Sequence, residues 1–448
     1  MLSLKELALK IGAEYRGSDL PVPAFSIDSR NLQKGEVFVA IRAERDGHTF
    51  IDNAIQNGAA ALLLDHAVDA PIPQIIVKDT LKAFGQMAHV WRKQFKIPVI
   101  GLTGTCGKTT TKEMIATILR GVGSTLASAG TFNNAYGVPL TLLQLRPEHQ
   151  FAVIEMGTNS PGEIAYIAEI AEPTVALITN IGASHLEKLG SFEGVSKEKS
   201  EIFTFLSEQG IAVLNQDEPF MPSWFAKIGP RHRLTYSIKE PADVFATDIH
   251  HGNDGVEFTL HTPIGIQSMK ILLPGNHMAA NAVAATSVCL AIGVSLDAIG
   301  KGLAHVQSVA GRFKQHNLKH GANLIDDSYN SSINSIQNAI ETLKGIHGRR
   351  VLVVTNLGEL GDHTDFYHTE LGKWLNEAKL DSVYLYGKKA LLNGTLQEYP
   401  QAQYFEDKSL LTEAIRQEIQ PGTTILIKGI NSLKMHTIVD ELLQEYHA

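Results

Sequence analysis

Residues 101–114 read GLTGTCGKTTTKEM, and this stretch decides the fold of the chain around it. The apolar run QFKIPVIGLTG (94–104) leads into the glycines as a buried strand does, and TTKEMIATILRGVG (110–123) continues at helical spacing. In such a unit, backbone N–H groups at the helix N-terminus enclose a phosphate, a lysine adds a point charge and a hydroxyl holds Mg²⁺. Lys108 and Thr109 suit those two roles. The alternative, a turn whose glycines merely permit tight packing, is disfavoured because strand, glycines, lysine and threonine come in this order.

The spacing of the glycines separates this loop from the general P-loop. The pattern G-x-x-x-x-G-K-[ST] would need glycine at position 102, where Leu102 stands. The loop is therefore shorter than the general motif. We expect it to hold the phosphates of a nucleotide through Gly104, Thr105, Cys106, Gly107, Lys108, Thr109 and Thr110.

Length and composition limit the class of protein. A chain of 448 residues is too long for one ordinary core, so we predict three domains. The formal net charge of −8 lacks the basic excess of nucleic-acid-binding proteins, so no nucleic-acid partner is expected. Two cysteines, Cys106 and Cys289, are too few for a disulfide framework and fit a reducing compartment. Without an apolar run of roughly eighteen residues, we predict a cytoplasmic protein that does not insert into a membrane, with a monomer as the default.

The order of the patterns predicts an α/β fold in three domains. Residues 1–96 mix short strand and helix patterns, as a small α/β domain does. Residues 97–310 form a central P-loop-type domain, because apolar runs of strand length alternate with helical segments as a mostly parallel sheet requires. Residues 311–448 alternate strand and helix as a doubly wound, Rossmann-like sheet.

Within the central domain, about residues 242–274 have the alternation of antiparallel strands. The tripeptide NDG (253–255) is a hairpin signal in the middle of this segment. We therefore predict an antiparallel insertion there.

Two polar side chains follow buried strands of the central domain. Glu155 stands at the end of FAVIEMG (151–157), and His185 comes shortly after TVALITNIG (174–182). The carboxyl ends of parallel strands meet at one edge of the sheet, so both side chains are expected beside the phosphate loop. Glu155 suits Mg²⁺, the alternative being a solvated carboxylate at a strand end. A lone histidine is more often structural.

The chain resembles the Mur ligase family along essentially its whole length. The motif G-T-x-G-K-T-T is shared with that family and with the related folylpolyglutamate synthetases. More specific marks are DSRNLQKGEVFVAIRAERDGHTFIDNAIQNGAAALL (28–63), FNNAYGVPLTLL (132–143), IEMGTNSPGEI (154–164), TNIGASHLEKLGS (179–191) and KEKSEIF (197–203). The resemblance implies three domains that bind, in chain order, a UDP-sugar substrate, ATP with metal, and the incoming amino compound.

The activity implied by the resemblance is ATP-dependent amide formation through an acyl phosphate. FNNAYGVPLTLL and the DSR region favour the member that joins D-alanyl-D-alanine to UDP-N-acetylmuramoyl-tripeptide, a step in making peptidoglycan precursors. A sister ligase that adds a different amino acid, an ordinary P-loop kinase or NTPase, and a non-catalytic nucleotide-binding homologue are the alternatives. Whether the tripeptide ends in diaminopimelate or lysine is not encoded in these motifs.

The resemblance also implies roles for single residues. His185 and Lys199 join Lys108 as catalytic residues, and two Mg²⁺ ions are expected on Thr109, Glu155, His185 and Lys199. Spacing alone does not choose between Lys197 and Lys199. The family pattern selects Lys199, which in relatives is carbamylated by CO₂. Further implied contacts to ATP are Asn281, Arg312, Asp327 and Tyr329, and those to the UDP substrate are Ser29, Arg30, Asn133 and Asn134.

Two loops of the third domain depart from the family pattern. Thr355 and Asn356 stand where Gly and Asp are expected, and Ile430 and Asn431 replace Ser and Arg. These loops should face the incoming amino compound. Loss of an arginine removes a bidentate clamp for a carboxylate, so another residue takes that role or the second substrate binds differently.

Overall fold

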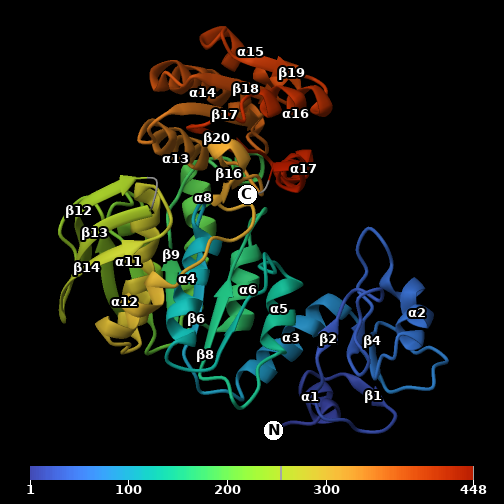
Figure 1. The fold of residues 1–448 in the computed structure, drawn as a ribbon. Coiled ribbons are helices and arrows are strands. Elements are labelled where there is room, and N and C mark those ends of the chain that lie inside the picture. The colour runs from blue at the N-terminus through green and yellow to red at the C-terminus, as the bar shows by residue number, and fades with distance from the viewer. Residues whose placement is uncertain (253–254, 447–448) are drawn as a thin grey trace.

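The computed structural model describes residues 1–252 and 255–446, and within them the chain forms three sheets, each covered by helices (Figure 1). The fold is α/β, as predicted. The three sheets follow one another along the chain: the first uses strands up to residue 76, the second strands from 99 to 271 and the third strands from 314 onward. The expected domain bounds, 96/97 and 310/311, fall in the connections between these sheets and remain predictions.

The first sheet has five short strands in the order β1-β5-β4-β3-β2. Strands β2, β3, β4 and β5 are parallel, and β1 joins the edge antiparallel to β5. A helix α1 precedes the sheet and begins with a capping box between Ser3 and Glu6. The elements are α1 (Leu4–Lys10), β1 (Glu14–Arg16), β2 (Phe25–Ser26), β3 (Val37–Val39), η1 (Gly47–Phe50), α2 (Ile51–Gln56), β4 (Ala61–Leu64) and β5 (Gln74–Ile76).

Helix α3 (Thr80–Arg92) connects the first sheet to the central one. It contacts α1 on one side and α5 and α6 on the other. Its last turn is tied to the central part, because Trp91 Nε1 donates to Leu145 O at 3.1 Å and Arg92 Nε donates to Ala171 O at 2.8 Å. Both side chains are buried, so α3 acts as a stiff joint between the two sheets.

The central sheet has nine strands in the order β14-β13-β12-β11-β10-β9-β6-β8-β7. The seven strands from β7 to β12 along this order are parallel, and the apolar runs of β6, β8, β9 and β10 are buried on both faces. The strands are β6 (Val99–Thr103), β7 (Thr125–Ala127), β8 (Phe151–Glu155), β9 (Val175–Ile178), β10 (Ile211–Asn215), β11 (His232–Ser237), β12 (Val244–Gly252), β13 (Gly255–Thr262) and β14 (Gly265–Ile271).

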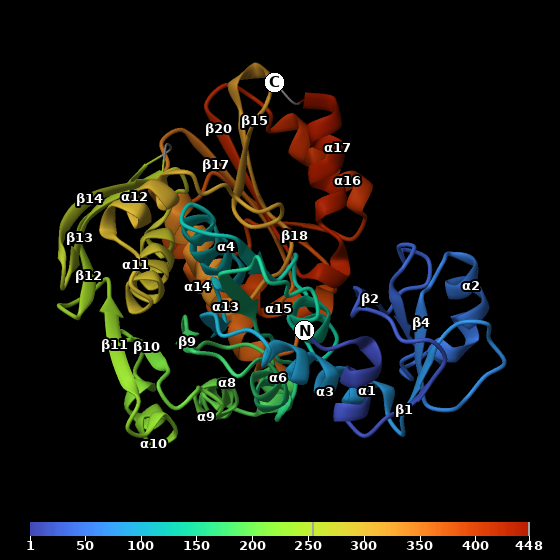
Figure 2. The same ribbon diagram turned by 90° about the horizontal axis from the view of Figure 1, so that it is seen from below.

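Helices cover both faces of the central sheet (Figure 2). One face carries α4 (Lys108–Arg120), α11 (Asn276–Ala291) and α12 (Leu296–Ala304), which pack on one another. The other face and its margins carry α5 (Gly137–Leu142), α6 (Glu163–Ala171), α7 (Leu186–Leu189), α8 (Phe192–Lys199), α9 (Glu201–Thr204), η2 (Met221–Trp224) and α10 (Phe225–Ile228).

The predicted antiparallel segment is present as β12, β13 and β14. It is not a separate sheet, because β12 pairs in parallel with β11 and so extends the central sheet at its edge. Of the predicted hairpin turn, residues 253 and 254 lie outside the described part of the chain, and Gly252 pairs with Gly255 beside them. The insertion therefore lengthens the central sheet away from the phosphate loop.

The third sheet has six strands in the order β15-β16-β20-β17-β18-β19, all parallel except β15. Residues of β17 and β20 alternate between two apolar clusters: Val351, Val353, Ile425 and Ile427 pack with α16 and α17, whereas Leu352, Val354 and Leu426 pack with α13 and α14. The sheet is therefore doubly wound, as predicted. Its elements are β15 (Lys314–Asn317), η3 (Lys319–Gly321), β16 (Asn323–Asp327), α13 (Ile333–Lys344), β17 (Arg349–Thr355), η4 (Gly361–His363), α14 (Thr364–Ala378), β18 (Ser382–Tyr386), α15 (Lys389–Glu398), β19 (Gln403–Phe405), α16 (Lys408–Gln417), β20 (Thr423–Lys428), η5 (Asn431–Leu433) and α17 (His436–Tyr446).

No helix in the described ranges, 1–252 and 255–446, is long and apolar enough to cross a membrane.

Candidate functional site

The loop between β6 and α4 has the geometry of a phosphate loop. Gly104 has φ +150° and Gly107 has φ +79°, both in the region that favours glycine. A Cβ on Gly104 would lie 1.9 Å from Thr179 Oγ1, so the first glycine also permits a close approach of two loops. Helix α4 begins at Lys108, and the N–H groups of its first turn have no intrahelical acceptor. They are free to bind an anion.

The segment after β9 fixes the shape of this loop. The backbone N–H groups of Thr105 and Cys106 donate to Asn180 O and Asn180 Oδ1, both at 2.9 Å. Thr179 Oγ1 donates in return to Cys106 O at 2.7 Å. The amides of Thr105 and Cys106 are thus used inside the protein, which leaves phosphate contacts to the amides from Gly107 onward and to the lysine.

Lys108 lies folded over the phosphate loop. Its Nζ donates to Gly104 O at 2.7 Å and to Thr105 O at 3.2 Å. Burial lowers the pKa of this ammonium, and the charge of Glu155 opposes that shift. The lysine lines the large cavity described below, so phosphate oxygens can replace the two carbonyl acceptors.

Glu155 is the centre of a buried polar cluster under the phosphate loop. Its Oε1 accepts hydrogen bonds from Thr109 Oγ1 at 3.3 Å and from Asn133 Nδ2 at 2.8 Å. Its Oε2 is buried and accepts no hydrogen bond from any residue in the described part of the chain. The closest cation is Lys112, whose Nζ lies 4.0 Å away. A carboxyl oxygen left without a hydrogen-bond donor in a buried site is suited to a metal ion.

The structure distinguishes the two lysines of α8. Lys197 is exposed, whereas Lys199 is 1% exposed. Burial holds the pKa of Lys199 well below its usual value, and the nearby charge of Lys108 lowers it further. The neighbouring Glu198 caps α6, since its carboxylate accepts from Gly162 N at 2.7 Å and from Ile164 N at 2.8 Å. These two hydrogen bonds fix the end of α8 and keep the Lys199 side chain buried.

His185 is bound to the third sheet domain. Its backbone is left-handed, with φ 54°, and its Nδ1 lies 2.5 Å from Glu359 Oε2. The hydrogen bond from His185 holds the pKa of the Glu359 carboxyl below its usual value. The backbone N–H of Glu187 also donates to Glu359 O at 3.1 Å. The predicted metal ligand thus contacts a carboxylate of the facing domain in this structure.

A cavity of about 1020 Å³ lies between the central and third sheets, between the loop region of α4 and the start of α13. It brings together residues that are far apart in sequence. Its central wall includes the phosphate loop, His185 and Asn281, and its C-terminal wall includes Arg312, Asp327, Tyr329, Glu359 and Lys428. Asn281 approaches the phosphate loop closely, because a Cβ on Gly107 would lie 2.4 Å from its Oδ1.

Groups on the C-terminal wall hold one another in place. Lys428 Nζ donates to Asp327 Oδ2 at 2.5 Å, and both residues are buried. Burial raises the pKa of the Asp327 carboxyl, and the Lys428 ammonium opposes that rise. The Arg312 guanidinium stacks over the Tyr329 ring, 4.3 Å from its centroid. Tyr329 OH in turn bonds Thr131 Oγ1 of the central part at 2.7 Å.

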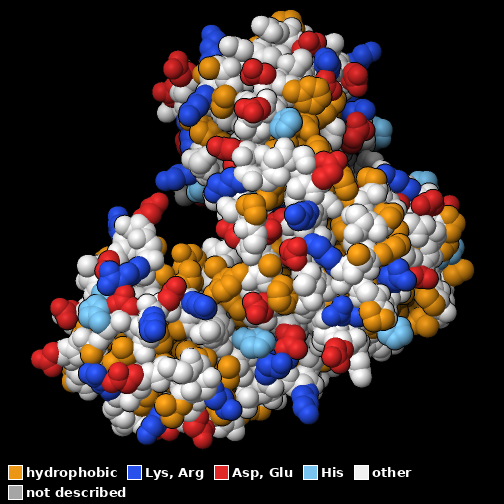
Figure 3. All heavy atoms as spheres, turned by 180° about the vertical axis from the view of Figure 1, so that it is seen from behind, with side chains coloured by type: hydrophobic (Ala, Val, Ile, Leu, Met, Phe, Trp, Pro, Cys, Tyr) orange, Lys and Arg blue, Asp and Glu red, His pale blue; other side chains and the backbone are white. Residues whose placement is uncertain are grey.

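The predicted UDP-substrate residues do not line this cavity. Ser29 is buried and its carbonyl accepts from Asn57 Nδ2, whereas Arg30 is largely exposed and pairs with Asp28 at 2.7 Å. Asn134 Oδ1 accepts from the backbone N–H groups at the start of α5. From behind, a wide notch separates the N-terminal part, at lower left, from the C-terminal part at the top (Figure 3). A substrate that reaches from Ser29 to the phosphate loop would have to cross this open face.

The third-domain residues that depart from the family pattern mainly support the loops in which they lie. Thr355 is fully buried, and its Oγ1 accepts from Ile430 N at 3.1 Å. Asn356 Oδ1 accepts from Lys388 N at 3.1 Å. Asn356, Lys388 and Ile430 line a second cavity of about 390 Å³, which shares residues 357–360 with the first. The two cavities therefore adjoin at Glu359.

Two residues of the site were missed by the sequence analysis. Lys112 is fully buried and donates to Ser128 O at 2.8 Å and to Gly130 O at 3.1 Å, which holds the loop before Asn133. Its place one helical turn after Lys108, on the same side as Ile115, was an available signal. Asn180 comes just after the buried strand β9, and Glu155 is the last residue of β8, so the same rule could have found Asn180.

Comparisons with known proteins point to the same family in all three parts of the chain. The family models "Mur ligase family, catalytic domain", "Mur ligase middle domain" and "Mur ligase, glutamate ligase domain" match residues 22–98, 102–289 and 311–431. The UDP-N-acetylmuramoyl-tripeptide–D-alanyl-D-alanine ligase of Escherichia coli (strain K12) is 41% identical over 445 residues, 98% of each chain. The chain belongs to the Mur ligase family.

Solved structures of this family have the same fold. A crystal structure of MurF from Acinetobacter baumannii has a TM-score of 0.91 at 34% identity and covers 98% of each chain. MurF ligase from Thermotoga maritima, in complex with ADP, has a TM-score of 0.84 at 28% identity and covers 95% of this chain and 98% of that one. As a Mur ligase, the protein is an ATP-dependent amide ligase.

Proposed function

We propose that this protein joins D-alanyl-D-alanine to UDP-N-acetylmuramoyl-tripeptide at the expense of ATP, forming the pentapeptide precursor of peptidoglycan. The observation that carries the proposal is the cavity in which the phosphate loop faces Arg312, Asp327 and Tyr329 across two domains. Support comes from the Escherichia coli relative, whose name states this reaction and which aligns with 98% of the chain. The altered loops at Thr355 and Ile430 leave the cavity itself in place.

The chemistry has two balanced steps. An oxygen of the tripeptide's terminal carboxylate attacks the γ-phosphorus of ATP, the bond from that phosphorus to the bridging oxygen breaks, and ADP leaves. The dipeptide's neutral amine then attacks the carbonyl carbon of the acyl phosphate, phosphate leaves, and the amine loses a proton. Phosphoryl transfer depends mainly on position and on charge neutralisation. Lys108 and the first-turn amides of α4 supply both on the central wall.

The oxygen atoms of Glu155 and Thr109 fit a magnesium ion. Mg²⁺ prefers oxygen ligands, and the buried Glu155 Oε2 accepts no hydrogen bond in the described part of the chain. Thr109 Oγ1 donates a hydrogen bond to the same carboxylate and would be a second ligand of the metal. When bound, Mg²⁺ neutralises charge on the phosphates. His185 would join only after its nitrogen leaves Glu359, so we propose that substrate binding separates these two side chains.

Lys199 fits the modification that the family resemblance implies. Carbamylation joins a neutral amine to CO₂ and releases one proton, so it needs a lysine that is uncharged near neutral pH. Burial and the charge of Lys108 lower the pKa of Lys199 and supply that form. The carbamate would place an anion beside Lys108, which would help to hold metal there.

The second cavity suits the incoming dipeptide. It adjoins the first cavity at Glu359 and includes Lys388, a cation that can pair with the dipeptide's terminal carboxylate. Lys388 is held in place by the bond from its N–H to Asn356. We propose that Lys388 takes the role of the arginine that the family pattern has at position 431, where this chain has Asn431. A Lys388→Ala protein should then show a raised KM for D-alanyl-D-alanine with the KM for ATP unchanged.

The decisive experiment incubates the protein with ATP, UDP-N-acetylmuramoyl-tripeptide and D-alanyl-D-alanine and measures the mass of the product. A pentapeptide formed together with one ADP per product is expected. Parallel reactions with single amino acids test the sister-ligase alternative, and ATP turnover without any amine would favour a kinase or NTPase. Absence of pentapeptide with every tripeptide variant would refute the proposal.

A further inference from the structure

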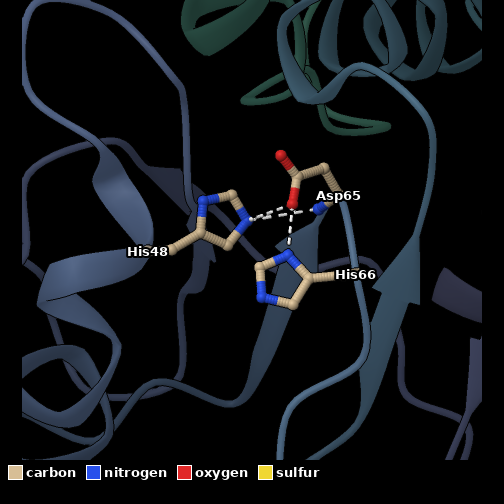
Figure 4. A group of neighbouring side chains, drawn as sticks. All are labelled: His48, Asp65 and His66. Atoms are coloured by element: carbon tan, nitrogen blue, oxygen red, sulfur yellow. Dashed lines mark hydrogen bonds and ion pairs between the residues drawn. The ribbon is translucent and has the colours of Figure 1, made fainter.

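The N-terminal part carries a cluster of two histidines and aspartates that the ligase reaction does not use. His48, Asp65 and His66 each point a ligand atom at one place, and these atoms all lie within 4.8 Å of one another (Figure 4). His48 Nε2 lies 3.1 Å and His66 Nδ1 lies 2.5 Å from the same oxygen, Asp65 Oδ1. We propose that these three side chains form a binding site for a transition-metal dication of the zinc class.

His48 is held through both of its ring nitrogens. Its Nδ1 lies 2.7 Å from Asp46 Oδ1, and its Nε2 lies 3.2 Å from the backbone N of Asp65. A carboxylate behind a histidine is the usual support of a metal-binding imidazole, because it fixes the tautomer and the ring orientation.

The spacing is close to what a metal needs. Bonds of about 2.0–2.2 Å in a tetrahedral arrangement place two ligand atoms roughly 3.3 Å apart. The distance from His48 to Asp65 is 3.1 Å, and the shorter one from His66 widens by rotation of a side chain that is 56% exposed. The rings of His48 and His66 already stack, with centroids 4.9 Å apart. Little rearrangement is therefore required.

Arg42 supports both carboxylates at the site. Its guanidinium pairs with Asp65 Oδ2 and, at 3.1 Å, with Asp46. A longer hydrogen bond of 3.4 Å from its Nη2 also reaches Asp65 Oδ1, so a bound ion would replace this weaker contact. Two imidazoles and one carboxylate suit zinc, copper or nickel better than Mg²⁺, which prefers oxygen.

The location in the fold supports a ligand site. His48 lies in the segment after β3, and Asp65 and His66 directly follow β4, its parallel neighbour. The carboxyl ends of parallel strands are where open α/β sheets bind ligands. Side-chain exposure rises from 8% at His48 to 56% at His66, so further coordination positions open to solvent. A bound ion would tie the loop 42–48 to the end of β4.

The test titrates chelator-treated full-length protein with zinc chloride by calorimetry, without nucleotide. His66→Ala is the main variant, because an exposed side chain can be removed without disturbing the core. His347→Ala, an exposed histidine before β17, is the matched control. We expect His66→Ala to lose one zinc equivalent or at least tenfold in its affinity, and His347→Ala to match the wild type. Zinc bound at the ATP site is unaffected by these changes and cancels in the comparison.

A second variant tests the role of Asp46. Asp46→Asn removes the carboxylate that supports the His48 ring at Nδ1, and we expect zinc affinity to fall tenfold or more. Zinc should also raise the unfolding temperature of the wild type by more than that of His66→Ala. Circular dichroism of each variant confirms folding. If His66→Ala keeps the wild-type zinc isotherm, or if His347→Ala loses as much, the proposal is wrong.

Discussion

The two sides of the large cavity manage their charges differently. On the central side, behind the residues that line the cavity, Glu155 keeps a buried oxygen without a donor in the described part of the chain, and Lys199 is buried near a second lysine. On the C-terminal wall, Asp327 is paired with Lys428 and Arg312 stacks on Tyr329. Buried charge that lacks a full set of partners is costly and marks a place prepared for a ligand. Charge that is already paired mainly holds a surface in shape. Changes on the central wall should therefore affect catalysis, and changes on the C-terminal wall should affect stability and substrate affinity.

The largest effect is expected from Lys108→Ala. Loss of the charge that faces the transferred phosphoryl group should lower kcat/KM by about 10³-fold. Stability should not fall, because burial already disfavours this ammonium. Steady-state ADP release and urea unfolding measure the two quantities. Activity within tenfold of the wild type would contradict the assignment of this wall to catalysis.

The next effect belongs to the opposite wall. Lys428→Met leaves the Asp327 carboxylate buried without its cation, so unfolding free energy should fall by about 3 kcal/mol, a factor of about 150. The double variant Asp327→Asn/Lys428→Met should recover much of that loss. Lys344→Met removes an exposed pair with Glu341 and serves as the control, with a loss under about 1 kcal/mol. An equal loss of unfolding free energy in both lysine variants would show that the buried pair contributes no more to stability than the exposed one.

Two lysines of α8 provide an internal comparison within the central domain. Lys199→Ala should lower kcat by about 10²-fold, because the buried group beside Lys108 is lost. Lys197→Ala removes an exposed lysine two residues earlier on the same helix and should keep wild-type kcat. Kinetics of both variants, run side by side, decide the matter. A Lys199→Ala protein with full activity would remove this residue from the mechanism.

The pH dependence should be smaller and should depend on CO₂. The pKa of Lys199 is lowered, so its amine is neutral at higher pH and becomes protonated as the pH falls through that lowered value. Protonation prevents carbamylation, hence activity in CO₂-depleted buffer should decline toward acid several-fold and recover on adding bicarbonate. The unfolded lysine binds its proton more tightly, so this group makes stability rise with pH up to the ordinary lysine pKa. A profile indifferent to bicarbonate would argue against the carbamate.

The smallest effect is expected from Tyr329→Phe. The ring that stacks under Arg312 remains, and only the hydrogen bond from the hydroxyl to Thr131 is lost. Such a bond contributes about 1 kcal/mol, which corresponds to about a fivefold rise in KM for ATP with kcat nearly unchanged. Initial rates over a range of ATP concentrations test this. A large loss of kcat instead would place Tyr329 in the chemistry.

The sequence predicted the long elements of the fold well and the short edge elements poorly. The strands β6, β8 and β9 beside the phosphate loop are continuous apolar runs. Such runs are typical of a parallel sheet that is buried on both faces. Among the elements that were not predicted are β15, a polar edge strand reading KQHN, the three-residue β19, and α15, none of which has a strong apolar period. Edge elements owe their conformation to the neighbour they pair with, and that neighbour is not visible in a local pattern.

By itself, the sequence determined the phosphate loop, because glycines with left-handed backbone, a lysine and a helix start are local features. It also placed Glu155 and His185 at the edge of the sheet where that loop lies. The tertiary structure alone decided that Lys199 is buried while Lys197 is not, that Glu359 holds His185, and that Lys112 approaches Glu155. Burial and charge pairing depend on segments far apart in sequence, as His185 and Glu359 are, so no local spacing encodes them. The cluster of His48, Asp65 and His66 likewise exists only because two parallel strands end side by side.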